Sequence, residues 1–197
     1  MPASDAQLLI FVVFAILIVV ILFASKRTEK QQKHADEQRP QKISTGEEWI
    51  ESLRSVKVKY VLDGDTVIVS GFWQEIRIRL DSIDCPEDGQ DWGNTAKYGL
   101  IKLIGERRVR IEEFGLDHYG RTLATIYIQN DDDSKWINVN ERMVTLGHAW
   151  VMRMYYDHLP QARKDQLNRL ERWARSKKVG LWKTPNPIPP WKWRREE

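Results

Sequence analysis

Residues 79–87 read Arg-Leu-Asp-Ser-Ile-Asp-Cys-Pro-Glu, and they end a segment in which apolar and charged side chains alternate. Such alternation is typical of a strand with one buried face. An arginine, two spaced acids and a proline at the end of a strand form a layout that suits a hard cation beside a phosphate. The stretch therefore points to phosphodiester chemistry.

The segments around this stretch predict the fold. Short strands with alternating polarity, bounded by turn signals, are expected at residues 56–62, 66–69, 75–83, 109–114 and 122–128. Helices are expected at residues 95–104, from the cap Asn138 to residue 146, and at 160–178, with an extended segment at 149–152. Five short strands interrupted by a helix predict an α+β fold, a five-stranded barrel of the oligonucleotide/oligosaccharide-binding (OB) type with about three helices.

Candidate catalytic residues lie at the end of the strand over residues 75–83. Hydrolysis of a phosphodiester needs a positioned water, a base for its proton, and positive charge where the phosphorus gathers negative charge. Arg79 alternates with apolar residues, so it is expected on the face away from the barrel core, where its planar fork could bind a phosphate. Glu87, just beyond Pro86, could serve as the base. An isolated strand arginine is usually a surface charge, so only the combination indicates chemistry.

Oxygen ligands for a hard cation are available at the same place. Pro86 lacks an amide hydrogen and restrains Cys85 to an extended conformation, so the chain leaves the strand and the Cys85 carbonyl can become free. With the carboxylates of Asp65 and Asp84, this carbonyl would give three hard ligands for Ca²⁺. Taken alone, the turn around Asp65 is an ordinary hairpin turn. The chain's only cysteine is thus expected to act through its carbonyl, with a dispensable thiol.

An unbroken apolar run at residues 8–24 would span roughly 25 Å as a helix, the low end of what a bilayer requires. We predict a single-pass anchor at residues 1–25 that contacts the bilayer through residues 8–24. A cleaved secretory signal is the alternative, but Asp5 and no Lys or Arg precede the run, and no clear small-x-small site precedes Ser25. The basic residues that follow favour a cytoplasmic domain, but phosphodiester chemistry there would face the cell's own genome, so the side is left open.

Composition divides the chain into four segments, namely the anchor at 1–25, a charged tether at 26–54, a domain at 55–184 and a Pro/Trp-rich basic tail at 185–197. Without the anchor, 31 basic and 27 acidic residues give a net charge of +4, which fits an anionic partner without requiring one. The tail is expected to be polyproline-like and to lie over the domain through its tryptophans. A proline-reading partner, or a basic contact with a membrane or nucleic acid, is the alternative.

Motifs along residues 55–195 resemble those of the staphylococcal nuclease (thermonuclease) family. In chain order they are Asp63-Gly64-Asp65-Thr66, Arg79-Leu80, Ile83-Asp84-Cys85-Pro86-Glu87, Gln90, Gly93, Ala96, Asp117-His118-Tyr119-Gly120-Arg121-Thr122-Leu123-Ala124, Val139-Asn140, Gly147-His148-Ala149-Trp150-Val151 and Gly180-Leu181-Trp182. The ending, Asn186-Pro187-Ile188-Pro189-Pro190-Trp191-Lys192-Trp193-Arg194, is similar to the tails of bacterial members of the family. Together they are highly specific. The resemblance implies a membrane-anchored member of that family with a nuclease domain.

This resemblance implies a calcium-dependent nuclease that cleaves DNA and RNA with little sequence specificity on the 5′ side of the phosphodiester link, leaving 3′-phosphates. By matching positions, the Ca²⁺ ligands would be Asp65, Asp84 and the Cys85 carbonyl. The catalytic residues would be Glu87, which activates water, and the two arginines that stabilise the transition state, Arg79 and Arg121. No obligate protein partner is expected.

Two departures from the family pattern concern the substrate. His118 stands where the staphylococcal enzyme carries a lysine, and it is expected to be a turn residue rather than a catalyst. Of the family's pair of tyrosines that help to seat the nucleotide, only Tyr155 can be placed, because Arg153 replaces the other. These three positions are the candidate substrate-binding residues, and base stacking and 5′-phosphate binding are expected to differ.

Two other functions remain open from the sequence. Barrels of this type can bind nucleic acid or protein without cutting it, and the domain could be such a module tethered to a membrane. A module that had lost catalysis would have no physical need for two arginines, an acid ligand and a base together, which favours the enzyme. A membrane scaffold that uses the Pro/Trp-rich tail would explain both ends of the chain but not this set.

Overall fold

The computed structural model describes residues 46–132 and 135–196, which belong to one compact unit, Ser44–Glu197. The predicted anchor at 1–25 and most of the predicted tether lie outside the described residues. Within the described ranges, no helix is both long enough and apolar enough to cross a membrane.

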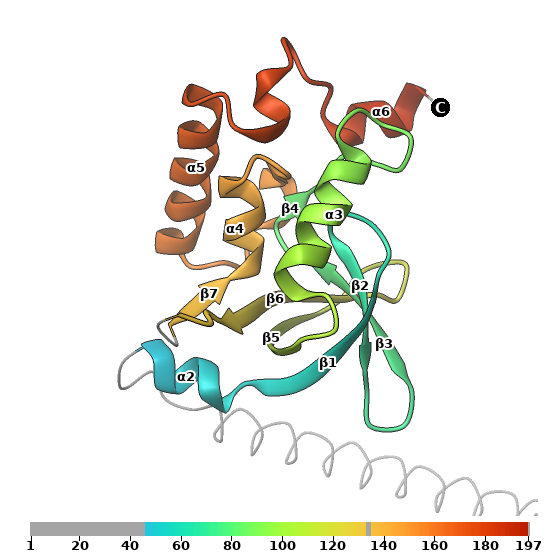
Figure 1. Ribbon diagram of the computed structural model, residues 1–197, viewed down its shortest axis with the longest axis vertical. Coiled ribbons are helices and arrows are strands. Elements are labelled where there is room, and N and C mark those ends of the chain that lie inside the picture. The colour runs from blue at the N-terminus through green and yellow to red at the C-terminus, as the bar shows by residue number, and fades with distance from the viewer. Residues whose placement is uncertain (1–45, 133–134, 197) are drawn as a thin grey trace, which may run out of the picture. The chain divides into compact units, whose positions relative to one another are not determined.

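A closed five-stranded barrel organises the domain (Figure 1). Its strands are β1 Arg54–Val61, β2 Thr66–Ser70, β3 Glu75–Leu80, β5 Arg108–Leu116 and β6 Thr122–Gln129. They pair in the order β3-β2-β1-β5-β6, and a parallel pairing of β3 with β6 closes the ring. A short strand, β7 (Trp136–Asn138), continues the sheet beyond β6. The predicted α+β fold with a five-stranded OB-like barrel is confirmed.

Alternating side chains fill the barrel because successive residues of a strand point to opposite faces. In β3, Ile78 and Leu80 are fully buried, whereas Arg77, which alternates with the apolar residues of this strand, is exposed. Helix α3 (Gly93–Ile104) joins the same core through residues spaced four apart, which share one helix face: Ala96, Leu100 and Ile104.

The predicted strand over residues 75–83 is divided in the structure. After β3 ends at Leu80, the chain reverses at Ser82, whose φ of 62° is left-handed, and a two-residue strand follows as β4 (Ile83–Asp84). β4 pairs with β8 (Trp150–Val151) instead of continuing the barrel. The prediction of one continuous strand was wrong, because alternating polarity carries no signal for a reversal at a serine.

The structure has one helix between the barrel strands and two after them, as predicted, with further helices near both ends of the described chain. The predicted helices are present as α3, α4 (Val139–Thr145) and α5 (Gln161–Ser176). Asn138 caps α4, as predicted, by accepting a hydrogen bond from the backbone N–H of Glu141 at 3.1 Å. A further short helix, α2 (Gly46–Ser52), lies in the last part of the range predicted as tether.

The tail also contains a helix, α6 (Pro190–Glu196). A polyproline-like conformation was predicted for the whole tail, and from residue 190 onward this is wrong. Proline is compatible with the first turn of a helix, where its missing N–H has no partner to lose. The run of prolines therefore leads into the helix.

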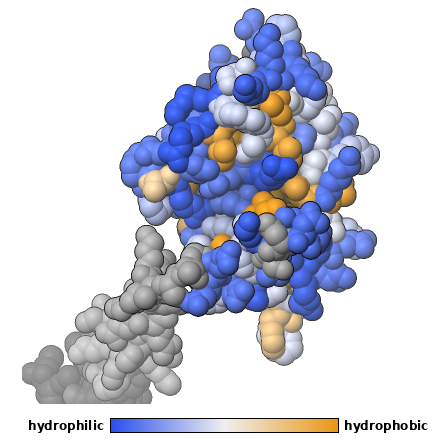
Figure 2. Space-filling model, turned by 60° about the vertical axis from the view of Figure 1, so that its left-hand side comes forward, coloured by the Kyte–Doolittle hydropathy of each residue, from blue (hydrophilic) through white to orange (hydrophobic). Residues whose placement is uncertain are grey.

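Figure 2 shows a largely hydrophilic surface with separate apolar spots. The spot at the foot of this view is the end of the β2–β3 hairpin, where Phe72 and Trp73 are 84% and 91% exposed. Their rings contact each other edge to face, with centroids 4.6 Å apart. This hairpin end lies at the opposite end of β3 from Arg79.

Candidate active site

The first carboxylate of the site comes from the turn between β1 and β2. Asp63 Oδ1 accepts a hydrogen bond from the backbone N–H of Asp65 at 2.9 Å, which fixes this turn. Only glycine fits at Gly64, because a Cβ there would lie 2.6 Å from the Cβ of Cys85. The close approach brings Asp65 against β4, where its Oδ2 accepts a hydrogen bond from the backbone N–H of Cys85 at 2.8 Å.

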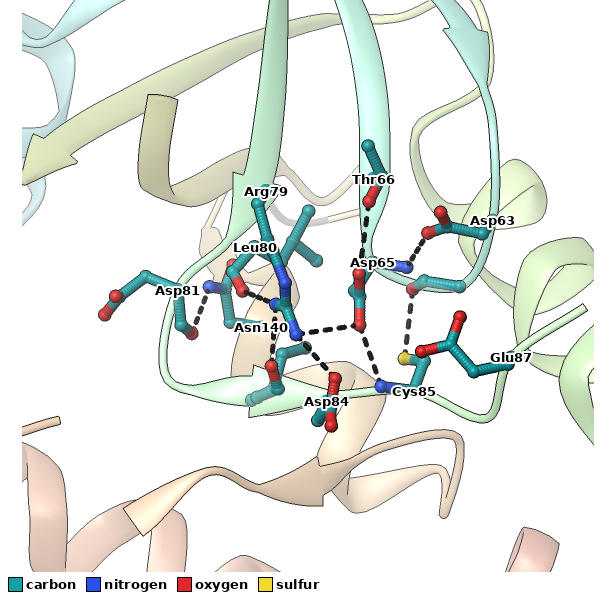
Figure 3. Close-up of polar contacts among 12 residues, drawn as sticks. Asp63, Asp65, Thr66, Arg79, Leu80, Asp81, Asp84, Cys85, Glu87 and Asn140 are labelled. Carbon is teal, nitrogen blue, oxygen red and sulfur yellow. Dashed lines mark hydrogen bonds and ion pairs between the residues drawn. The ribbon is translucent and has the colours of Figure 1, made fainter. Parts of the chain in front are cut away.

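Arg79 joins this carboxylate to a second one, Asp84 (Figure 3). Its Nη2 lies 2.6 Å from Asp84 Oδ1 and 3.4 Å from Asp65 Oδ2. Its Nη1 donates to the backbone carbonyls of Leu80 and Ile83, both at 2.8 Å. Arg79 thus lies opposite the core-facing residues of β3, as predicted. Its side chain is nevertheless only 14% exposed, because the reversed chain folds back toward it.

Four carboxylates, those of Asp63, Asp65, Asp84 and Glu87, outnumber two arginines, Arg79 and Arg194, at this end of the barrel. Burial and the nearby charge of Asp65 raise the pKa of Asp84 to about 6, although two arginines act in the opposite direction. Burial and the same Asp65 charge raise the pKa of Asp63 to about 6. Burial lowers the pKa of Arg79, but Asp65 and Asp84 outweigh it, so its pKa lies above the ordinary value. Crowded carboxylates of this kind are stabilised by an added cation.

The thiol of Cys85 has a structural role. It is buried, and its Sγ donates to the Gly64 carbonyl at 3.1 Å. Burial, followed by the charges of Asp65 and Asp84, raises the pKa of the thiol well above its ordinary value. A neutral thiol is a poor nucleophile and a poor metal ligand. The side chain of Cys85 therefore holds the Asp63–Thr66 turn against β4 and leaves the chemistry to other groups.

Glu87 lies in the loop that leads into α3. Its backbone N–H donates to Gln90 Oε1 at 3.0 Å, and its carbonyl accepts from the Gln90 N–H at 3.1 Å. The loop packs tightly against the start of the helix, since a Cβ on Gly93 would lie 2.0 Å from the Glu87 carbonyl oxygen. The side chain of Glu87 is 36% exposed. The site therefore offers one carboxylate to solvent beside the buried Asp84.

Arg194, on α6, contacts both of these carboxylates. Its Nη2 donates to Asp84 Oδ2 at 2.9 Å, its Nη1 lies 3.4 Å from Asp84 Oδ1, and Nη1 also donates to Glu87 Oε1 in a short contact. The Arg194 side chain is 42% exposed. The guanidinium therefore bridges Asp84 and Glu87 from the outer side of the site.

The carboxylate oxygens of the site are of the kind that a hard cation binds. Asp65 and Asp84 direct carboxylate oxygens toward the same Arg79 nitrogen, and carboxylates are ligands that Ca²⁺ prefers. Within residues 46–132 and 135–196, no group of three or more His, Cys, Asp and Glu side chains is arranged to hold a metal ion. A cation here would need backbone, water or substrate oxygens besides the two carboxylates. The predicted set, with the Cys85 carbonyl as third ligand, is of that kind.

Arg121 and His118 lie where β5 turns into β6. Arg121 Nε donates to Asp117 Oδ2 at 2.7 Å. Burial raises the pKa of Asp117, but hydrogen bonds from Arg121 and from the Tyr119 backbone, with the Arg121 charge, lower it below the ordinary value. Because β6 runs parallel to β3, Arg121 enters the strand beside the one that carries Arg79. His118 is exposed and contacts the Tyr119 ring, which agrees with a turn residue.

The other predicted substrate residues lie in a 3₁₀ turn, Arg153–Tyr155, directly after β8. Arg153 Nη2 donates to Glu171 Oε2 at 2.6 Å, which ties this arginine to α5. Tyr155 is 66% exposed. Since β8 pairs with β4, the turn follows a strand that borders Asp84. Tyr155 therefore presents an exposed ring, as does His118 beside Tyr119, whereas Arg153 is engaged in an ion pair.

Comparison with known proteins shows the family to which this chain belongs. The model of a protein family described as "Staphylococcal nuclease homologue" matches residues 77–184, more than half of the chain. The chain belongs to this family. The resemblance inferred from the motifs is thereby confirmed. The match begins within β3 and includes Arg79, Asp84 and Glu87.

Relatives of this staphylococcal nuclease homologue match over most of their length. "Protein ParB" of Escherichia coli is 40% identical over 151 residues, which cover 75% of this chain and 82% of that protein. "Micrococcal nuclease" of Shigella flexneri is 40% identical over 142 residues, covering 71% and 79%. An "Uncharacterized endonuclease" of Escherichia coli O157:H7 is 38% identical over 138 residues, covering 70% and 83%.

Two supporting residues of this nuclease-family domain stand in the motif run, but sequence reasoning assigned no role to either. Asn140 is buried and donates to the Asp81 carbonyl at 3.0 Å, and its Oδ1 accepts from the Ile126 N–H at 3.1 Å, so it holds the reversed chain to β6. Its signal was a polar side chain on the buried face of a predicted helix. Gln90, which fixes the backbone of Glu87, had no signal beyond its place in the family motif.

Proposed function

We propose that this chain is a calcium-dependent nuclease that hydrolyses phosphodiester bonds of DNA and RNA with little sequence specificity and leaves 3′-phosphates. The observation that carries the proposal is the convergence of Asp65, Arg79 and Asp84 at the end of β3, with Glu87 beside them. Membership of the family supports the dependence on calcium and the nature of the product. The names of relatives, a micrococcal nuclease and an endonuclease, support the reaction class.

Each residue has a separate task in the proposed reaction. Glu87, the exposed carboxylate, takes a proton from the water whose oxygen attacks phosphorus. Arg79 and Arg121 balance the negative charge that gathers on the phosphate oxygens, which a planar fork can do with two bonds at once. The bond from phosphorus to the 5′-oxygen breaks, that oxygen takes up a proton, and the phosphate stays on the 3′ side.

Arg79 and Arg121 start from different positions. Arg79 is fixed by two backbone carbonyls and keeps its charge between two carboxylates. Arg121 is paired with Asp117, so it must exchange this partner for a phosphate oxygen. The ligands of the cation would be the carboxylates of Asp65 and Asp84 and the backbone carbonyl of Cys85. Ca²⁺, when bound, supplies positive charge for the phosphate.

The test uses the full-length protein in detergent with an end-labelled single-stranded oligonucleotide. We expect cleavage in millimolar calcium and none in excess chelator. The new 5′ ends should carry hydroxyl groups, which accept a kinase label without prior phosphatase treatment. No cleavage by folded protein in calcium would overturn the enzyme, and full cleavage in chelator would overturn the metal dependence. New ends with 5′-phosphates would overturn the proposed bond choice.

The bilayer contact of residues 8–24 and a single-pass membrane location are also proposals. They rest on the apolar run in the sequence, which lies outside the described residues. Detergent is included in every assay for this reason.

A further inference from the structure

The C-terminal segment, residues 185–196, reaches the site described above. Its helix α6 carries Arg194, whose guanidinium contacts both carboxylate oxygens of Asp84, at 2.9 and 3.4 Å, and donates to Glu87 Oε1. Asp84 is a proposed ligand of the cation, and Glu87 is the proposed base. The family match ends at residue 184, so the segment lies beyond the matched domain.

Two further contacts dock this segment beside the site. Gln90 Nε2 donates to the carbonyl of Ile188 at 2.6 Å, while Oε1 of the same side chain accepts from the Glu87 backbone. Trp191 packs edge to face on Trp150, with ring centroids 5.6 Å apart. In Figure 1, α6 accordingly lies by the loop that leads into α3. The contact of Arg194 is therefore part of a docked segment, with Gln90 as the link between segment and base.

This docking is looser than the packing of the barrel core. A cavity of about 220 Å³ lies under the segment, lined by Trp150 and Trp193 among others. Both indole N–H groups are buried and have no hydrogen-bond partner among the described residues. Buried donors without a partner weaken an interface. Since Arg194 is also 42% exposed, water competes for its ion pairs.

Arg194 and a divalent cation require the same oxygens. Asp84 Oδ1 accepts from Arg79 and Oδ2 accepts from Arg194, so a metal ion that approaches Asp84 from the outer side meets lone pairs that Arg194 already uses. Glu87 Oε1, which must accept a proton from water in the proposed reaction, is also bound by Arg194. In addition, a divalent cation beside the guanidinium would place like charges next to each other.

We propose that the C-terminal segment is an intramolecular competitor of the divalent cation. Arg194 occupies the outer side of Asp84 and Glu87 when no cation is bound, and binding of the cation releases α6. The segment thereby lowers the apparent affinity for calcium and keeps the base covered until calcium arrives. This inference rests on the proposed function, since it assumes a cation at Asp84.

Calcium titration by calorimetry on the full-length protein in detergent tests the competition without using activity. Arg194→Gln removes the ion pairs, and Arg195→Gln makes the same charge change on the next, exposed residue of the helix. The fraction of molecules with a free site limits the apparent affinity. We expect Arg194→Gln to bind calcium on the order of tenfold more tightly than wild type, and Arg195→Gln to stay within about twofold.

Hydrogen exchange read by mass spectrometry gives the second measurement, on peptides from residues 185–197. Calcium should speed exchange in this segment of the wild type, and Arg194→Gln should show the fast exchange without calcium. Trp191→Ala keeps Arg194 but removes the aromatic contact with Trp150, so it should shift both measurements in the same direction as Arg194→Gln.

The outcomes separate this inference from the proposed function. Equal calcium affinity in the Arg194→Gln and Arg195→Gln variants, with exchange of the segment unchanged by calcium, would overturn the competitor and leave the nuclease standing. Weaker calcium binding by Arg194→Gln would make Arg194 a support of the cation site and would also overturn it. Absence of calcium binding in every variant would overturn both the competitor and the metal dependence.

Discussion

Two arginines bind Asp84, one from the barrel and one from the C-terminal segment, and they are held very differently. Arg79 is 14% exposed and makes two bonds to backbone carbonyls besides its two contacts with carboxylates. Arg194 is 42% exposed, and its contacts are with the carboxylates of Asp84 and Glu87. Exposed ion pairs contribute little stability, whereas removing one partner of a buried pair is costly.

The comparison assigns different tasks to the same chemical group. The backbone bonds fix Arg79 relative to β3, so it can act as a permanent part of the site. The contacts of the Arg194 guanidinium are with carboxylates and not with backbone carbonyls, so a divalent cation can replace it. Three further predictions test this difference between an inner region, fixed by the barrel, and an outer region that can leave.

Glu87→Gln, at the boundary of the two regions, should have the largest effect. The amide keeps the size of the side chain but cannot take a proton from water, so the cleavage rate in saturating calcium should fall by about 10²–10⁴-fold. Initial rates on a single-stranded oligonucleotide measure this. Glu75→Gln is the matched control, because Glu75 is exposed at the other end of β3. If Glu87→Gln cleaves at the wild-type rate, Glu87 is not the base.

Arg79→Lys and Arg194→Lys compare the two regions directly. Lysine keeps the charge but loses the planar fork, so Arg79→Lys loses bonds that orient it toward Asp84 and the phosphate. We expect its kcat to fall by about 10²–10³-fold, the usual effect of removing one charge-stabilising group. Arg194→Lys should show no fall in kcat at saturating calcium. Equal losses in both variants would mean that the two arginines share one task.

Much of the inner region was predictable because its signals are local. Alternation of isoleucine and leucine with charged residues placed Arg79 opposite the barrel core, and the turn residues around Asp65 placed that acid at a strand end. The reversal at Ser82 was not predictable in the same way, since its left-handed φ depends on the tertiary bonds that hold residues 81–84.

The outer region could not be placed from local patterns. Arg194 meets Asp84 across 110 positions of the sequence, and the contact depends on where α5 and the turns after it deliver the tail. The sequence showed that the tail had tryptophans suited to lie over the domain, but proline content alone predicted an extended conformation where α6 is helical. Charge pairing between distant segments has no period that a sequence pattern can reveal.

The smallest expected effect concerns how the turn at Asp63–Thr66 is held in the inner region. Cys85 is buried and its thiol donates to the Gly64 carbonyl at 3.1 Å. Thr and Val have the same shape, but only the threonine hydroxyl can replace this donor, and an unmade bond to a buried carbonyl is costly. The free energy of unfolding should therefore be about 1 kcal/mol higher for Cys85→Thr than for Cys85→Val, so the threonine variant is the more stable one.

Urea unfolding followed by tryptophan fluorescence measures this difference, and both variants keep the Cys85 backbone carbonyl. The valine variant then reports what the donor contributes at constant shape. Equal stability of the two variants would show that the thiol contact contributes nothing. The turn would then be held by the Asp63 hydrogen bond and by the close packing of Gly64 on Cys85, which already fix Asp65 beside Arg79.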